Sequence, residues 1–224
     1  EETESKGPSI MISQEDKEFV KTHIILALAH VPSFGVLKQF EEIIYVVARY
    51  EMPDKWPNAM NEIADLLNAE DEHKVFGGLI ALKEVVHKFE FDFREDRKPL
   101  QEIVNNLFPR IEQILTNLID VNTDDAYRAK NIIVKTFYLA NQASLSDRYK
   151  NLETFDALVD LVVKAFTQPL PSEFTELTED TDRIDKLTKS DQWQLKRNCI
   201  RLFNKMFTQL SDPEMVEDSF LELS

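Results

Sequence analysis

The sequence is short of several residue types on which particular classes of protein depend. It contains one cysteine, Cys199, so an internal disulfide and a cysteine-rich zinc site are both excluded. Only 4 of its 224 residues are glycine, which suits helices joined by short polar turns better than a sheet with many glycine-dependent hairpins. No apolar run approaches the roughly 20 residues that a membrane helix needs, and the first residues have no signal-peptide pattern. We therefore expect a soluble, intracellular, all-helical protein.

Acidic residues outnumber basic residues in the sequence. The formal net charge is −15, from 41 acidic and 26 basic residues. A field of this sign attracts basic proteins and repels the phosphate backbone of nucleic acids. Direct binding of nucleic acid is therefore disfavoured, and basic protein partners are favoured.

Patterns that carry catalysis are also missing. There is no phosphate-binding loop and no glycine-rich dinucleotide fingerprint, and Gly77-Gly78 lies within a helical pattern, where it favours close approach of two helices. The four histidines show no metal-ligand spacing. Cys199 has arginines two residues to either side, which point to other faces of a helix, so we expect a small core residue rather than an activated thiol. We expect no enzyme activity, no cofactor and no metal.

Apolar residues recur at helical spacing along the chain. In the central stretch Val75, Leu79, Leu82, Val86 and Phe89 are spaced by four, three, four and three residues and share one helix face. Similar stripes predict pairs of helices whose first members begin near residues 14, 55, 98 and 150. The first two steps, about 41 and 43 residues, match HEAT repeats, and the third is longer by about one insertion. The spacing favours a HEAT-repeat α-solenoid of stacked helical hairpins, wound as a right-handed superhelix, over an ordinary helical bundle, which these stripes also fit.

End signals set the expected boundaries. Ser13, Asp54 and Thr123 are candidate N-caps, and Pro57 and Pro99 suit the first turn of a helix. We expect a flexible lead-in at 1–12, four repeats at 13–52, 53–91, 92–145 and 146–211, an insertion at 169–190 within the last of them, and the start of a further repeat at 212–224.

Several short sequence motifs in these repeats resemble motifs of one known family. An acidic-Lys-Trp-Pro turn spans Asp54 to Pro57, a Gly-Leu-rich helix with an aromatic-acidic end spans Gly78 to Phe89, and an Arg-x-Pro-Leu word spans Arg97 to Leu100. A further block, Asp191 to Phe207, is similar to a Trp- and Lys-rich helix of the same family, with Asn198 where the family often has a second tryptophan. Together they resemble the N-terminal region of the importin-beta superfamily, in the subgroup of importin seven, importin eight and their fungal relatives.

The resemblance implies a function in nuclear transport. Members of this superfamily are non-catalytic receptors that shuttle between cytoplasm and nucleus, contact Phe-Gly nucleoporins and exchange cargo under the control of Ran-GTP. For this subgroup it implies import of basic proteins such as ribosomal proteins and histones. An export receptor of the same superfamily and a HEAT scaffold unconnected with transport remain open.

Two features are candidate contact sites. The insertion is acidic and has no clear helical pattern, so it is either a functional or a solvated loop. Its acidic residues are expected to hold basic cargo or a basic patch on Ran: Glu173, Glu176, Glu179, Asp180, Asp182 and Asp185. Trp56 is a candidate exposed contact for a Phe-Gly motif, although packing within the turn is the more frequent outcome for such a residue.

Overall fold

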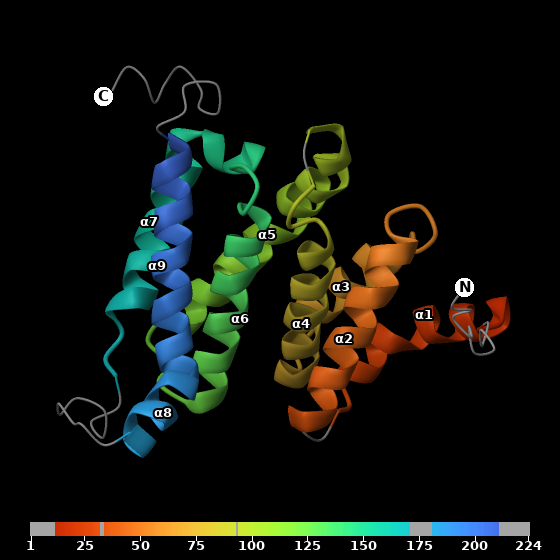
Figure 1. The fold of residues 1–224 in the computed structure, drawn as a ribbon, viewed down its shortest axis with the longest axis horizontal. Helices are drawn as coiled ribbons and strands as arrows, with labels where there is room; N and C mark the ends of the chain where they lie inside the picture. The colour runs from red at the N-terminus through yellow and green to blue at the C-terminus, as the bar shows by residue number, and fades with distance from the viewer. Residues whose placement is uncertain (1–11, 32–33, 93, 171–180, 211–224) are drawn as a thin grey trace, which may run out of the picture.

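The computed structural model describes residues 12–31, 34–92, 94–170 and 181–210. Within these ranges every regular element is a helix, and the helices follow one another as hairpins (Figure 1). The four hairpins are α1 (Gln14–Leu28) with α2 (Phe34–Glu51), α3 (Ala59–Leu67) with α4 (Glu72–Lys88), α5 (Lys98–Leu118) with α6 (Asp124–Ala140), and α7 (Leu152–Thr167) with α9 (Asp191–Leu210). Helix α8 (Thr181–Lys189) and the 3-10 turns η1 (Arg94–Arg97) and η2 (Asp147–Lys150) lie in the connections.

The hairpins stack as two layers. The second arms pack side by side in the order α2, α4, α6, α9, and the first arms follow in the order α1, α3, α5, α7. In Figure 1 the second arms α4, α6 and α9 lie in front of the first arms α3, α5 and α7. Each hairpin therefore contacts mainly its neighbours, as repeats in a solenoid do. This confirms the all-α HEAT-repeat solenoid. The expected lead-in, except Ile12, and the further repeat lie outside the described residues.

Helix starts follow several of the predicted signals. The Ser13 side chain accepts a hydrogen bond from the Asp16 N–H, the Thr123 side chain accepts one from Ala126, and Pro99 lies in the first turn of α5. Two predictions are wrong: Asp54 does not cap α3, and Pro57 precedes the helix, which begins at Ala59. The chain between them forms turns whose Trp56 ring is buried, and this packing delays the start of the helix.

The glycine pair allows α4 to approach the first arms closely. A Cβ atom on Gly78 would lie 3.0 Å from the Leu66 Cβ and 3.1 Å from the Leu67 nitrogen on α3. One on Gly77 would lie 3.1 Å from the Leu28 Cβ on α1. All three distances are shorter than ordinary van der Waals contacts, so the predicted role of these glycines in close helix packing is confirmed.

Second-arm lysines close the ends of the first arms. Lys130 on α6 donates to the carbonyls of Ile119 (3.1 Å) and Val121 (2.8 Å), just beyond the end of α5. Lys196 on α9 donates to the carbonyls of Phe166 (2.5 Å) and Gln168 (2.6 Å) at the end of α7. These carbonyls have no partner within their own helix, and they carry the negative end of the helix dipole. The third and fourth hairpins are therefore each tied by a cation from the second arm.

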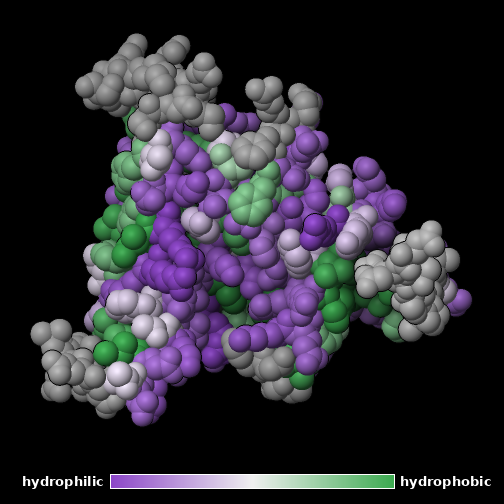
Figure 2. All heavy atoms as spheres, in the orientation of Figure 1, coloured by the Kyte–Doolittle hydropathy of each residue, from purple (hydrophilic) through white to green (hydrophobic). Residues whose placement is uncertain are grey.

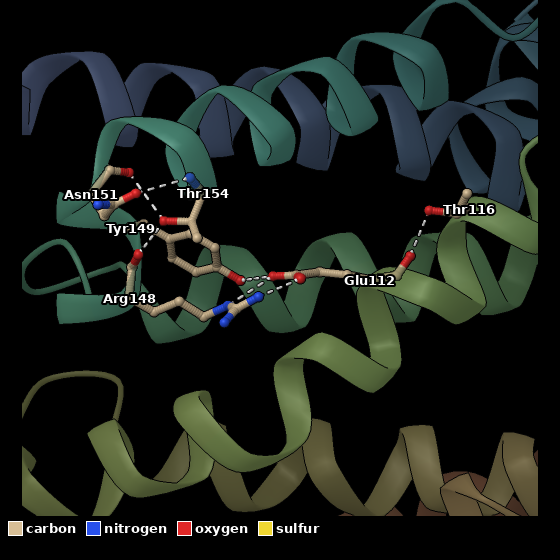
Figure 3. A network of polar contacts seen from close by, with 6 residues as sticks. All are labelled: Glu112, Thr116, Arg148, Tyr149, Asn151 and Thr154. Carbon is tan, nitrogen blue, oxygen red and sulfur yellow. Dashed lines mark hydrogen bonds and ion pairs between the residues drawn. The ribbon is translucent and has the colours of Figure 1, made fainter.

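A polar network joins the third and fourth hairpins on the first-arm side (Figure 3). Arg148 of η2 donates to both carboxylate oxygens of Glu112 on α5, at 3.1 and 2.7 Å, and the Tyr149 hydroxyl donates to one of them at 2.8 Å. The Thr154 hydroxyl, on α7, donates to the carbonyls of Arg148 and Asn151. The network fixes the turn before α7 against α5.

Candidate functional site on the second-arm face

The acidic insertion contains a helix that its sequence pattern did not reveal. Residues 181–189 form α8, which packs against α9, so the expectation of a loop without helix is wrong for this half. The segment has few apolar residues, so its sequence shows no apolar periodicity. An ion pair within the helix contributes to its stability, because Lys189 contacts Asp185 at 2.6 Å. Of the candidate acids, Asp182 and Asp185 are exposed on α8, while Glu173, Glu176, Glu179 and Asp180 lie outside the described residues.

The two roots of the insertion meet at a polar hollow of about 630 Å³ beside the start of α6. The Tyr127 hydroxyl donates to the Asn122 side chain at 2.9 Å and to the Pro169 carbonyl at 3.4 Å. Arg128 contacts Asp191 at 3.3 Å, which ties α6 to the start of α9. The insertion is therefore anchored to the third hairpin at both ends.

A buried ionic cluster lies at the centre of the second-arm layer. Lys83 on α4 contacts Glu41 on α2 at 3.1 Å and Glu84 on its own helix at 2.9 Å. His87 lies between two carboxylates, with its Nδ1 3.3 Å from Glu84 and its Nε2 3.4 Å from Glu90. Because α2 and α4 both contribute charges, this cluster joins the first and second hairpins.

The pKa values of the cluster follow from burial and pairing. Burial alone would lower the pKa of Lys83, but the attraction of Glu84 and Glu41 outweighs it, and the pKa is raised. Burial alone would raise the pKa of Glu84, but hydrogen bonding from His87 and the charge of Lys83 leave it lowered. Both groups therefore stay charged near neutral pH. On α6, desolvation and the charge of Lys83 lower the pKa of Lys135.

Around this cluster the second-arm face is polar. Figure 2 shows it as mainly hydrophilic, with hydrophobic patches toward the α7–α9 end and toward the α1–α2 end. At the α1–α2 end a groove of about 900 Å³ is lined by exposed Ile43, Val46 and Tyr50 of α2.

Trp56 is 4% exposed and belongs to the core. Its interpretation as an exposed aromatic contact is therefore corrected, because a ring packed under the α2–α3 turn offers no face to a Phe-Gly motif. Cys199 is also fully buried, and burial raises the pKa of its thiol to about 12. Its thiol stays protonated at neutral pH, as the expected core position requires.

No group of three or more histidine, cysteine, aspartate or glutamate side chains is placed to hold a metal ion in residues 12–31, 34–92, 94–170 and 181–210. Across the same ranges, no helix combines the length and apolar character that crossing a membrane requires.

Sequence comparison relates this chain to nuclear transport receptors. It is 27% identical over 198 residues to a probable importin-7 homologue of Dictyostelium discoideum, an overlap that covers 88% of this chain and 18% of that protein. It is 22% identical over 213 residues to importin-8 of Mus musculus, which covers 95% of this chain and 20% of that protein. This confirms the resemblance to the importin-beta superfamily. The chain is also 22% identical over 219 residues to exportin-2 of Drosophila melanogaster, covering 95% of this chain and 22% of that protein.

The importin-beta relatives are much longer than the matched region, so this chain spans about a fifth of the length of the curated relatives it matches. No protein-family model matches the chain, and no solved structure matches it.

The structure gives physical reasons for the sequence motifs that resemble those of the importin-beta superfamily. In the Arg-x-Pro-Leu word, Arg97 is 3% exposed and donates to the carbonyls of Ala140 (2.8 Å) and Ser144 (3.0 Å) near the end of α6, while Leu100 is buried in the core. Asn198, which replaces a frequent tryptophan, donates to the Asn131 side chain at 2.8 Å and joins α9 to α6. The first motif therefore stabilises packing within the third repeat, and Asn198 stabilises packing between the third and fourth repeats.

The ionic cluster and the anchor at the insertion roots were not predicted. Lys83, Glu84 and His87 form an i, i+1, i+4 pattern that many exposed helices share, and their pairing with Glu41 depends on the register between α2 and α4. The one available signal was that Lys83 and Glu84 fall within an otherwise apolar run from Leu79 to Val86. Charges at such positions are buried and require partners.

Proposed function

We propose that this chain is a segment of a nuclear transport receptor of the importin type. The observation that carries the proposal is similarity to importins over 88–95% of the chain, on a two-layer stack of helical hairpins. The intact protein would bind basic protein cargo, such as ribosomal proteins or histones, in the cytoplasm, cross the nuclear pore by contacting Phe-Gly nucleoporins, and release cargo in the nucleus when Ran-GTP binds. It would act as a binding protein without catalysis.

A flexible solenoid suits such exchange. Each hairpin contacts mainly its neighbours, so small changes at successive hairpin contacts add up along the stack. If Ran-GTP and cargo favour different curvatures, each weakens the binding of the other by shifting the population of states.

A nuclear export receptor is the second candidate, and similarity to exportin-2 over 95% of the chain supports it. The two candidates differ in the sign of the coupling between cargo and Ran-GTP. The test measures association of the intact protein with a core histone and with a basic ribosomal protein, with and without Ran loaded with a non-hydrolysable GTP analogue. Importers lose cargo, exporters gain it, and a scaffold outside transport shows no change.

Within the proposed importer, the acidic insertion is the candidate cargo contact. Each exposed ion pair contributes only about 0–1 kcal/mol, so affinity would arise from many weak contacts. Replacing Glu179, Asp180 and Asp182 by lysine is expected to weaken basic cargo binding and to flatten its salt dependence in the intact protein.

The matched control reverses three exposed acids elsewhere, Asp65, Asp156 and Asp160, which changes the net charge equally. Equal cargo affinity in the two variants would show that only the overall field matters, and the insertion would then have no specific role.

A further inference from the structure

One helix of this acidic protein is cationic. Helix α9 carries four basic side chains and one acidic one, whereas the whole chain has a net charge of −15. Lys196 is held by the carbonyls at the end of α7. The other three, Arg197, Arg201 and Lys205, are here called the cation row.

The cation row has no acidic partner. In the described part of the chain, none of its three members forms an ion pair, and Arg197 contacts only the Gln194 side chain, at 3.5 Å. Some other cations are paired, as Arg148 is with Glu112. Exposed lysines such as Lys17, Lys74 and Lys164 form no ion pair within the described residues either. What distinguishes the row is that three such cations follow one another along a single helix of a protein in which acids outnumber bases by 41 to 26.

The spacing of the row places its charges on one side of α9. Members four residues apart lie one helical turn apart, at about 6 Å intervals. Arg197 and Arg201 are exposed and Lys205 is half-buried. In Figure 2 a strongly hydrophilic patch lies over the middle of α9 on the second-arm face. Like charges at this spacing repel each other within the helix, so the row does not stabilise α9 by itself.

Two polar contacts fix α9, which carries the row, against α6. Asn198 bonds to Asn131, and the Gln209 side chain donates to the Asn141 carbonyl at 3.1 Å. These two bonds, separated by similar numbers of residues on both helices, hold α6 and α9 parallel and in register.

The charge of the whole molecule restricts the partner. At physiological ionic strength charges act over about 8 Å, so a short ligand senses mainly the local cations. A long phosphate polymer or an anionic membrane would also meet the acidic surroundings and be repelled. A short segment of protein with carboxylates about 6 Å apart fits the row, either as a helix with acids four apart or as an extended chain with acids two apart.

We propose that the cation row is a docking surface for a short acidic segment of a partner protein. It is opposite in charge to the acidic insertion and faces the second-arm side of the third and fourth hairpins. This surface does not depend on the transport function proposed above, and either can fail without the other.

The test measures binding of a fluorescein-labelled, alanine-based helical peptide with glutamate at every fourth residue, by fluorescence anisotropy in about 50 mM NaCl. A peptide with glutamine at those positions is the ligand control. Replacing the three residues of the cation row by glutamine keeps helix propensity and is expected to lower the affinity at least about tenfold. The protein control replaces the exposed lysines Lys17, Lys74 and Lys164 by glutamine, changes the net charge equally, and should lower the affinity by about twofold or less.

Three results would overturn the proposal. Equal losses in the two triple variants would mean that only the overall field acts. Failure of the unmodified chain to bind the acidic peptide more tightly than the glutamine peptide would mean that the row is not a docking surface. Binding that emerges only after Glu173, Glu176, Glu179 and Asp180 are replaced by glutamine would mean that the chain's own insertion occupies the row.

Discussion

The hydroxyl of Tyr149 and the guanidinium of Arg148 both point at the Glu112 carboxylate (Figure 3). Tyr149 is fully buried, and this burial together with the nearby Glu112 charge raises the pKa of its hydroxyl well above the usual value. The Glu112 hydrogen bond raises the pKa of Arg148 as well. At the scale of single residues, these shifts record groups held in one protonation state by their partners.

Glu112 is therefore expected to stabilise the joint between the third and fourth hairpins. Replacing it by alanine leaves the buried Tyr149 hydroxyl without its acceptor and should lower the free energy of unfolding by about 2 kcal/mol. This estimate is kept small because the Glu112 and Arg148 side chains are 23% and 22% exposed, so solvent screens the pair. Urea denaturation measures the change.

The control replaces Glu102, an exposed glutamate on the same helix, by alanine, and should change stability by about 0.5 kcal/mol or less. A double-mutant cycle with Tyr149→Phe isolates the hydroxyl contact. Additive losses in that cycle would contradict the network.

Cys199 makes the free energy of unfolding depend on pH, and the raised pKa of its thiol sets the direction. Burial raises the pKa of its thiol from 9.0 to about 12, so the unfolded chain loses this proton first. Stability from the protonated thiol is full below pH 9 and is lost as the pH rises toward 12. Relative to Cys199→Ala, which has no thiol, the unmodified chain should lose about 2 kcal/mol of unfolding free energy between about pH 8 and about pH 10.5. A stability difference between the two proteins that does not change with pH would show that the thiol ionises equally in both states.

At the scale of helices, one arrangement occurs in both the third and the fourth hairpin. A lysine of the second arm donates to the free carbonyls at the end of the first arm. Lys130 and Lys196 occupy corresponding places in the third and fourth hairpins and serve α5 and α7 in turn. Desolvation lowers the pKa of both lysines, but each retains two carbonyl acceptors. The arrangement satisfies backbone groups that would otherwise lack partners as the hairpins pack.

Replacing Lys196 by methionine keeps the length of the side chain and removes both hydrogen bonds. We predict a loss of about 1–2 kcal/mol in unfolding free energy and faster amide exchange in the last turn of α7, because the carbonyls of Phe166 and Gln168 lose their donor. Lys205→Met on the same helix, where no carbonyl is contacted, is the control for the change of residue type. Equal exchange in the two variants would mean that Lys196 does not hold the end of α7.

Helix positions were predictable wherever apolar periodicity coincided with an end signal. Ser13, Thr123 and Pro99 mark helix starts because capping is local in sequence. Helix α8 was missed because its residues are mostly polar, and α3 starts later than predicted because packing of Trp56 overrides the Asp54 signal. Local capping signals therefore do not predict a helix start where tertiary contacts determine it.

The candidate site was less predictable than the helices. The acidic insertion was evident from composition, but the pairing of Lys83 with Glu41 and the contact of Asn198 with Asn131 depend on register between helices. Register arises from the whole packed layer, and a single sequence does not encode it in any short pattern.

At the scale of the whole molecule, the stack carries charge of both signs on one protein of net charge −15. The acidic insertion leaves and rejoins the stack at the start of α6, and the cation row lies along α9. Hydrophobic side chains gather toward both ends of the stack (Figure 2). Such a surface suits a protein that binds several macromolecules in different places, as the proposed transport function requires.

We propose that the intact protein is a transport receptor under the control of Ran. The most direct measurement is the affinity of the intact protein for Ran loaded with a non-hydrolysable GTP analogue, compared with Ran-GDP, by isothermal titration calorimetry. We predict at least about tenfold tighter binding of the GTP form, because a receptor can be switched only by a ligand whose nucleotide states bind it differently. Equal affinity for the two nucleotide forms, or no binding of either, would contradict the claim.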